Sequence, residues 1–327
     1  MAAAGVGSLS ANSRRSAFPV AGLALALALT GSVAPAGAQT LYRFVSAAGH
    51  LVYSDRLPTG PELATLTGQG RRPSTTAVKL VEARRPDGQA ALVAVNTVPA
   101  WTQVAYRISA SRNLDPGVPR AGNILLPPLA EAELAPLVAI DDASMPEVDI
   151  DYQYLLGHPG ARHRPDGPYR LPYARDEAYR VSQAYPDLRT HASEENRHAV
   201  DFEMPVGTPI LAARAGLVVE ALGEFQSGGG LGRERDRANF VRLLHEDGTF
   251  GLYGHLAWQS IRVVPGQRVA RGQHLADSGN TGFSSGPHLH FVVQLNRAGA
   301  MESVPVMFAG AEGAEFSPVT GDRPQSY

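Results

Sequence analysis

The sequence predicts a mainly β protein, in which a compact antiparallel β domain near the C-terminal end follows a small β-sandwich-like domain. Three observations support this fold class. Short apolar runs alternate with polar residues at period two, as in residues 104–108. Glycine-containing turn triplets such as Pro-Asp-Gly at 86–88 and Glu-Asp-Gly at 246–248 separate these runs. The 3.6-residue periodicity of amphipathic helices is almost absent.

Composition and charge limit the classes of function. The chain has 327 residues, of which 44% are hydrophobic, and its net charge is −2, which fits a globular protein of about two domains and does not favour nucleic-acid binding. It contains no cysteine, so disulfides, thiol nucleophiles and a lipoprotein anchor are excluded. Any zinc site must therefore use histidine, aspartate or glutamate.

The first 38 residues are typical of a cleaved signal peptide. Arg14 and Arg15 precede an apolar run over about residues 17–33, and the small residues 36–38 form a cleavage site. The alternative is a membrane anchor, but the run is shorter than the roughly 20 residues that a spanning helix needs. We therefore expect an exported protein without a stable membrane anchor after cleavage. The arginine pair leaves general and twin-arginine export both open.

Two small units are predicted to follow the signal peptide. Residues 39–62 form a β-hairpin module with strands near 41–45 and 51–54, and residues 63–76 form a linker. The hairpin resembles a module found at the N-termini of bacterial envelope proteins. Residues 77–165 form a β-rich accessory domain without a cluster of catalytic residue types. We expect residues 39–165 to position or cover the catalytic domain, or to bind a partner protein of the cell envelope.

The predicted catalytic domain covers residues 166–312 and precedes a tail at 313–327. It contains His288-Leu289-His290, in which an extended backbone would point both imidazoles to the same face. In the run 198–205, Asp201 alternates with apolar residues and faces the open side. Two histidines, one aspartate and a water form a catalytic zinc shell. Each motif alone also occurs by chance.

Three sequence blocks together resemble the lysostaphin-type (LytM-like) zinc metallopeptidases over roughly residues 169–310. The blocks are 199–210 around Asp201, 252–256 ending in Tyr-Gly-His-Leu, and 279–291 with His-Leu-His. The resemblance implies enzymes that cleave peptide bonds in peptidoglycan with one zinc ion per chain. It makes Asp201 and His290 zinc ligands, and it makes His255 and His288 catalytic histidines beside the metal-bound water.

The first zinc ligand departs from the family pattern. The family has a histidine four residues before the aspartate, and this chain has Arg197 at that position. His198, three residues before Asp201, would point to the opposite strand face. His191, ten residues before it, can return through a loop. Gram-negative relatives are similar in having a histidine well upstream. We predict His191 as the ligand and His198 as the alternative.

The leading function is an exported zinc endopeptidase that acts on peptidoglycan peptides, in the periplasm by resemblance to Gram-negative relatives or else secreted. Bound zinc would lower the pKa of its water, and His255 or His288 would accept the proton. One alternative is a non-catalytic relative that activates other cell-wall hydrolases. Another is a zinc-dependent hydrolase or lyase that acts on a different polymer. The scissile bond, the division of roles between the two histidines and the oligomeric state stay open.

Overall fold

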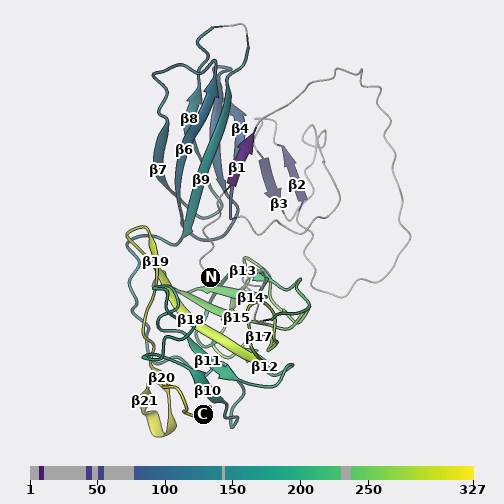
Figure 1. Cartoon of the computed structure of the whole chain (residues 1–327), viewed down its shortest axis with the longest axis vertical. Helices are drawn as coiled ribbons and strands as arrows, with labels where there is room; N and C mark the ends of the chain where they lie inside the picture. The colour runs from purple at the N-terminus through teal and green to yellow at the C-terminus, as the bar shows by residue number, and fades with distance from the viewer. Residues whose placement is uncertain (1–6, 11–41, 46–50, 55–76, 142–143, 230–236) are drawn as a thin grey trace, which may run out of the picture.

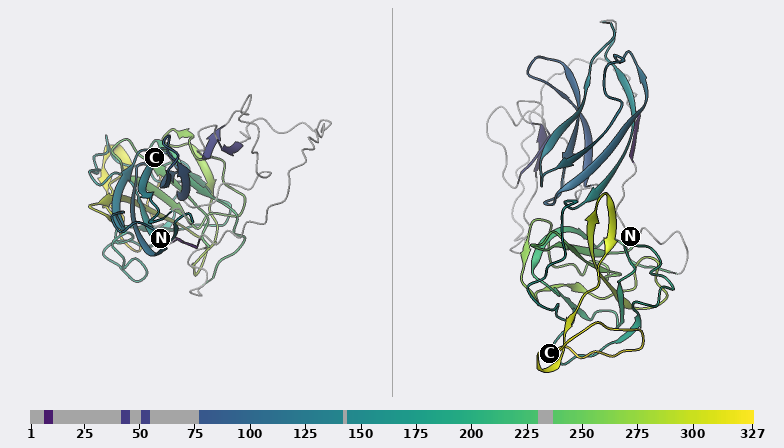
Figure 2. Two further views of the ribbon diagram at one scale, coloured as in Figure 1. Left: turned by 90° about the horizontal axis from the view of Figure 1, so that it is seen from above. Right: turned by 90° about the vertical axis from the view of Figure 1, so that its left-hand side faces the viewer.

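The computed structural model describes residues 7–10, 42–45, 51–54, 77–141, 144–229 and 237–327. Most of the predicted signal peptide and the whole predicted linker lie outside these residues. The described chain is nearly all β, and its helical structure is one short 3-10 turn, η3 (Ala311–Gly313). No helix among these residues is both long and apolar enough to cross a membrane. Two β bodies are stacked along the long axis of the molecule (Figures 1 and 2).

The accessory domain is a sandwich of two antiparallel sheets. One sheet has the strand order β4-β5-β8 and the other β1-β9-β6-β7. Along β6 (Thr102–Arg112) buried and exposed residues alternate, so Val104, Tyr106 and Ile108 enter the core. The remaining strands are β4 (Val78–Arg84), β5 (Ala90–Asn96), β7 (Ala121–Leu126), β8 (Glu131–Leu137) and β9 (Glu147–Leu156).

The N-terminal strands are short. β1 (Gly7–Ser10) pairs with β9 and lies inside the segment predicted to be a signal peptide, whose cleavage stays a prediction. β2 (Tyr42–Val45) and β3 (Leu51–Ser54) pair antiparallel, as the hairpin prediction requires.

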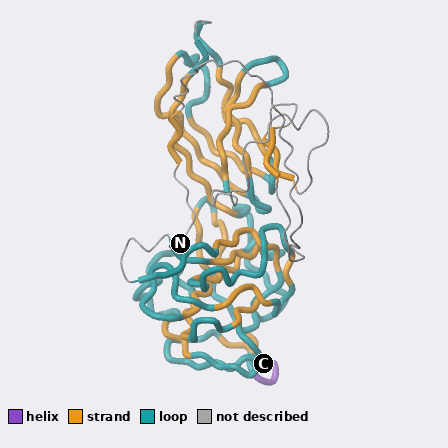
Figure 3. The backbone as a smooth tube through the Cα atoms, turned by 90° about the vertical axis from the view of Figure 1, so that its right-hand side faces the viewer, coloured by secondary structure: helices purple, strands orange, loops and turns teal. Residues whose placement is uncertain are grey.

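The C-terminal body is organised around an antiparallel sheet of order β10-β11-β18-β15-β14-β13-β16, in which β19 also pairs with β18. Its bent strands and connecting loops enclose a core (Figure 3). The long strand is β18 (His288–Arg297), which carries the His-Leu-His motif between β11 (Val200–Glu203) and β15 (Phe250–Gly254). The other strands of this sheet are β10 (Arg180–Gln183), β13 (Gly216–Leu222), β14 (Phe240–Leu244), β16 (Arg268–Val269) and β19 (Ala300–Ser303).

Two further strand pairs complete this body. β12 (Pro209–Leu211) pairs with β17 (His274–Asp277), and β20 (Phe308–Ala309) pairs with β21 (Glu315–Phe316). The segment predicted to be a tail is hydrogen-bonded to the rest of the body. The Tyr173 hydroxyl donates to the Pro324 carbonyl, and the Ser326 carbonyl accepts from the Asp176 N–H.

The two bodies share apolar and polar contacts at their junction. Phe250 and Met301 pack with the core residues of the sandwich. The Asn296 side-chain amide donates to the Gly157 carbonyl at 2.9 Å and to Gln103 Oε1 at 3.2 Å. Since Asn296 lies on β18, the strand that carries the motif histidines also reaches the accessory domain.

Candidate metal centre and flanking histidines

Strand pairing brings the predicted aspartate and histidines together. On β11 and β18, Asp201 lies opposite His290 and Glu203 lies opposite His288. Leu289 and Phe291, between and beyond the histidines, are fully buried in the core. The period of two therefore places both imidazoles on the other face, together with Asp201. Gly254 lies opposite His290 from β15, so no side chain fills the space there.

His191 reaches this face from the loop between β10 and β11. The Glu194 carbonyl accepts hydrogen bonds from the Ser303 N–H at 2.9 Å and hydroxyl at 2.7 Å. The Glu195 carbonyl accepts a third bond, from the Gln294 side chain at 2.9 Å. These contacts fix the loop against β18 and β19.

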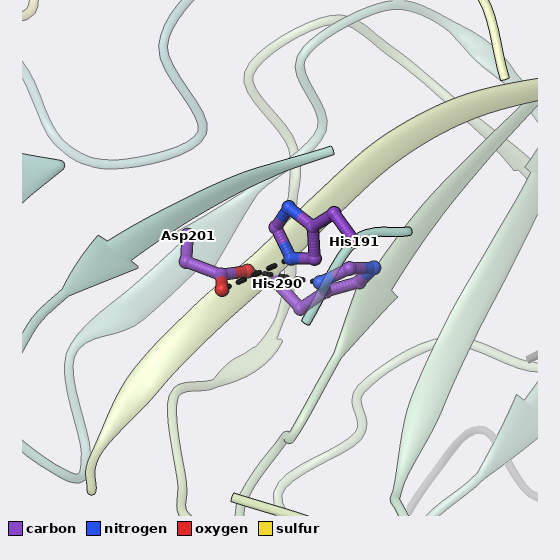
Figure 4. Close-up of side chains that lie close together, drawn as sticks. All are labelled: His191, Asp201 and His290. Carbon is purple, nitrogen blue, oxygen red and sulfur yellow. Dashed lines mark hydrogen bonds and ion pairs between the residues drawn. The ribbon is translucent and has the colours of Figure 1, made fainter. Parts of the chain in front are cut away.

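His191, Asp201 and His290 form one compact cluster, with one nitrogen or oxygen atom from each lying within 4.8 Å of the others. His191 Nε2 lies 3.1 Å from Asp201 Oδ2, and His290 Nδ1 lies 2.9 Å from Asp201 Oδ1. Figure 4 shows the two imidazoles and the carboxylate pointing toward one another. His191 and Asp201 are buried, and His290 is largely covered.

The protonation of this cluster follows from burial and charge. Burial raises the pKa of Asp201, but the hydrogen bonds from His191 and His290 outweigh this effect and hold the pKa well below its usual range. Burial lowers the pKa of His290, against the opposing effect of Asp201. The cluster thus combines an ionised carboxylate with an imidazole whose neutral form is favoured.

His255 and His288 lie beside this cluster, with ring centroids 4.5 Å apart. Each Nδ1 donates to a backbone carbonyl: His255 to Thr281 at 2.6 Å and His288 to Gly286 at 2.8 Å. Because a carbonyl can only accept, both Nδ1 atoms carry the hydrogen and both Nε2 atoms keep a lone pair. His288 Nε2 lies 3.9 Å from Asp201 Oδ1, so its lone pair is near the cluster.

His255 is held in the neutral form. Burial, assisted by the neighbouring His288 and His290, lowers its pKa to about 3. Its backbone has a φ of 60°, an uncommon conformation for a residue other than glycine. His255 therefore does not continue the face of β15, and Tyr253 does not share its direction. Tyr253 is buried, and its hydroxyl accepts from the Ala213 N–H, so it packs in the core.

The remaining histidines of the C-terminal body lie outside the cluster. The His198 ring lies 5.0 Å from the Tyr185 ring, so the structure places His191, and not His198, beside Asp201. Buried His245 donates from Nδ1 to the Ala215 carbonyl. His274 Nε2 pairs with Asp277 Oδ1 at 2.8 Å.

Sequence reasoning missed Asn196, whose Oδ1 lies 3.2 Å from His290 Nε2. It also missed the carbonyls of Thr281 and Gly286 that orient the two flanking histidines. No local pattern identifies these groups, because loops that are far apart in sequence bring them to the site.

The cluster fits a zinc ion by the chemistry of its donors. Two imidazole nitrogens and one carboxylate oxygen are a common ligand set of catalytic zinc, which leaves a coordination position open. The protons that now lie between the imidazoles and Asp201 are those that a bound cation would displace. His191, Asp201 and His290 would hold the ion, and His255 and His288 would stay beside it.

Comparison with known proteins gives matches over the same region. Residues 195–301 match the sequence model of Peptidase family M23. The peptidoglycan DD-endopeptidase ShyA of Vibrio cholerae is 34% identical over 122 residues, which are 36% of this chain and 26% of that protein. The glycyl-glycine endopeptidase ALE-1 of Staphylococcus capitis is 42% identical over 97 residues, 29% of this chain and 24% of that protein.

The matched region is only part of these relatives, since the chain spans about a quarter of the length of each. Among solved structures, the catalytic domain of lysostaphin from Staphylococcus simulans is 31% identical. That match covers 38% of this chain and 81% of that chain, with a TM-score of 0.25.

Proposed function

We propose, from the match of residues 195–301 to Peptidase family M23, that the chain is a zinc metalloendopeptidase that hydrolyses peptide bonds in peptidoglycan. The single observation that carries the proposal is that five side chains, two of them from outside the strands, meet at one place beside the sheet. His191, Asp201 and His290 offer three ligand atoms, and His255 and His288 stand next to them with Nε2 lone pairs.

The zinc ion, when bound, would supply a positive charge that lowers the pKa of a water and polarises the scissile carbonyl. His255 and His288 supply the proton transfers. One Nε2 accepts a proton as the water oxygen bonds to the carbonyl carbon. The imidazolium that forms then donates a hydrogen bond to the developing oxyanion or gives this proton to the amine that leaves when the carbon–nitrogen bond breaks. Either histidine can take this part, because both keep an Nε2 lone pair. Both Nδ1–H groups stay on backbone carbonyls, which keeps the rings oriented.

A non-catalytic relative that activates other hydrolases is the competing function. Such a protein does not need a full ligand set or two imidazoles beside it. The presence of all five side chains in one place favours catalysis. We also propose export to the periplasm, which rests on the predicted signal peptide and on the substrate.

Two variants separate the roles of the motif histidines. His290→Ala is expected to lose both bound zinc and peptidoglycan hydrolysis. His288→Ala is expected to keep zinc at wild-type stoichiometry and to lose hydrolysis by about 100-fold or more, the scale of a general acid–base group. The measurements are metal content of the purified chain and release of soluble muropeptides. Wild-type chain that binds zinc but releases no muropeptides, and instead stimulates another hydrolase, would favour the regulatory function.

A further inference from the structure

An exposed ion pair lies in the same row of side chains as His288. Arg180 on β10 is opposite Glu203 on β11, and Glu203 is opposite His288 on β18. Directly opposed residues of an antiparallel pair point to the same face. Glu203 is also two residues from Asp201, so this row shares the face of the metal cluster.

The pair is accessible to a ligand, unlike the cluster. Arg180 Nη1 lies 2.8 Å from Glu203 Oε1, and the two side chains are 55% and 47% exposed. An exposed pair of this kind contributes little to stability, so it opens at small cost. A guanidinium has five N–H donors. Within the described part of the chain, the hydrogen bond to Glu203 uses one of them.

The pair is close enough to take part in substrate binding. Adjacent strands lie about 4.8 Å apart, so the Arg180 and His288 backbones are separated by roughly 10 Å, and the arginine side chain spans much of that gap. Arg189 is a second arginine near Asp201. Its guanidinium is engaged by the Asp187 carboxylate and the Ser182 carbonyl, which leaves Arg180 as the better placed donor.

A cation and an anion side by side complement an α-amino acid, which carries a carboxylate and an amine on one carbon. We propose that Arg180 and Glu203 form a subsite for the amine side of the scissile bond, selecting cross-links in which that amine's carbon also carries a free carboxylate. This inference rests on the proposed peptidase function and names its substrate class. Cross-links through diaminopimelate have this chemistry, whereas a bond inside a glycine bridge does not.

The geometry assigns one task to each partner. Arg180 binds the substrate carboxylate through its free donors, in the forked geometry that guanidinium and carboxylate share. When water cleaves the bond, its oxygen stays on the new carboxyl group and its proton goes to the leaving nitrogen. Glu203 then lies next to the ammonium that forms.

The test uses two cross-linked muropeptide dimers that differ at one group. In one dimer the carboxylate beside the leaving amine is free, and in the other it is a primary amide. The wild type is expected to prefer the free acid. Arg180→Gln is expected to lower kcat/KM on the acid by about 10- to 100-fold, through KM, and to change the amide by less than about twofold. Arg180→Lys should restore part of the preference.

Arg297→Gln is the matched control, because Arg297, as exposed as Arg180, also forms a surface ion pair, with Glu302 at the far end of β18. It should leave both dimers unchanged, and zinc content should be equal in all variants. An equal loss on both dimers in Arg180→Gln, or no loss on either, would overturn the subsite. Zinc-loaded wild type that cleaves neither dimer would overturn the proposed function itself, which is a different result.

Discussion

His191 and Asp201 are ten residues apart in sequence, yet His191 Nε2 lies 3.1 Å from Asp201 Oδ2. The loop between β10 and β11 folds back over the sheet face to make this contact. His198 is nearer to Asp201 in sequence, but its ring lies beside Tyr185 and not beside the carboxylate.

The first prediction follows from this contact. His191→Ala should lower zinc affinity by more than about 100-fold, since removal of a direct ligand exceeds the cost of removing a ligand's neighbour. His198→Ala, the matched control, should lower it little. Competition with a chelator of known affinity measures both. Equal zinc affinities in the two variants would show that His191 is not the ligand.

The second prediction concerns Gln294, which is buried and whose amide supports the Glu195 carbonyl. Gln294 is itself held by Arg242, whose Nη1 donates to Gln294 Oε1 at 3.2 Å. Gln294→Leu removes one of the bonds that fix the His191 loop, so zinc affinity should fall about tenfold, the lower end of the loss seen when a residue that holds a metal ligand in place is removed. Gln103→Leu at the domain junction serves as the control. A variant that unfolds more easily but binds zinc like the wild type would limit Gln294 to a structural role.

The strand-based part of this site could be predicted from strand alternation, whereas His191 was predicted only with the help of the family resemblance and the contacts of its loop were not predicted. Asp201, His288 and His290 follow from alternation at period two, which is a local property of extended chain. His191 reaches Asp201 because its loop folds back over the sheet. The residues that hold this loop, Ser303 and Gln294, lie about a hundred residues further along the chain. The positive φ of His255 could not be predicted from the residue pattern of β15 either. The accessory sandwich was predictable as β structure, because strands such as β6 and β9 also alternate.

The third prediction concerns two neighbouring glycines near Thr281, the residue whose carbonyl orients His255. A Cβ at Gly228 would overlap the backbone of Gly282, whereas a Cβ at Gly229 would meet nothing within 4 Å. Gly228→Ala should therefore displace the loop at 280–282 and reduce turnover at unchanged zinc content. Gly229→Ala should keep wild-type turnover. The measurement is the rate of muropeptide release by the two variants. Similar rates would show that the contact between Gly228 and Gly282 does not orient His255.

The fourth prediction is a pH dependence of stability from His245. Burial lowers its pKa from 6.5 to about 4 in the folded chain. The unfolded chain therefore binds this proton first as the pH falls, and stability is lost between about pH 6.5 and 4. The loss is on the order of 3 kcal/mol from this group.

His245→Asn keeps a donor for the Ala215 carbonyl and removes the titration. Chemical unfolding with chelator present, at several pH values, should show a flatter acid limb for this variant. Parallel pH curves for variant and wild type would contradict the assignment.

The most direct test of the central claim is mass spectrometry of purified peptidoglycan after incubation with the chain. We predict fragments with new amino and carboxyl ends from hydrolysed peptide cross-links. A chelator should abolish them, added zinc should restore them, and His290→Ala should not produce them. The same fragments from His290→Ala, or from the wild type in excess chelator, would contradict the account of a zinc peptidase built on His191, Asp201 and His290.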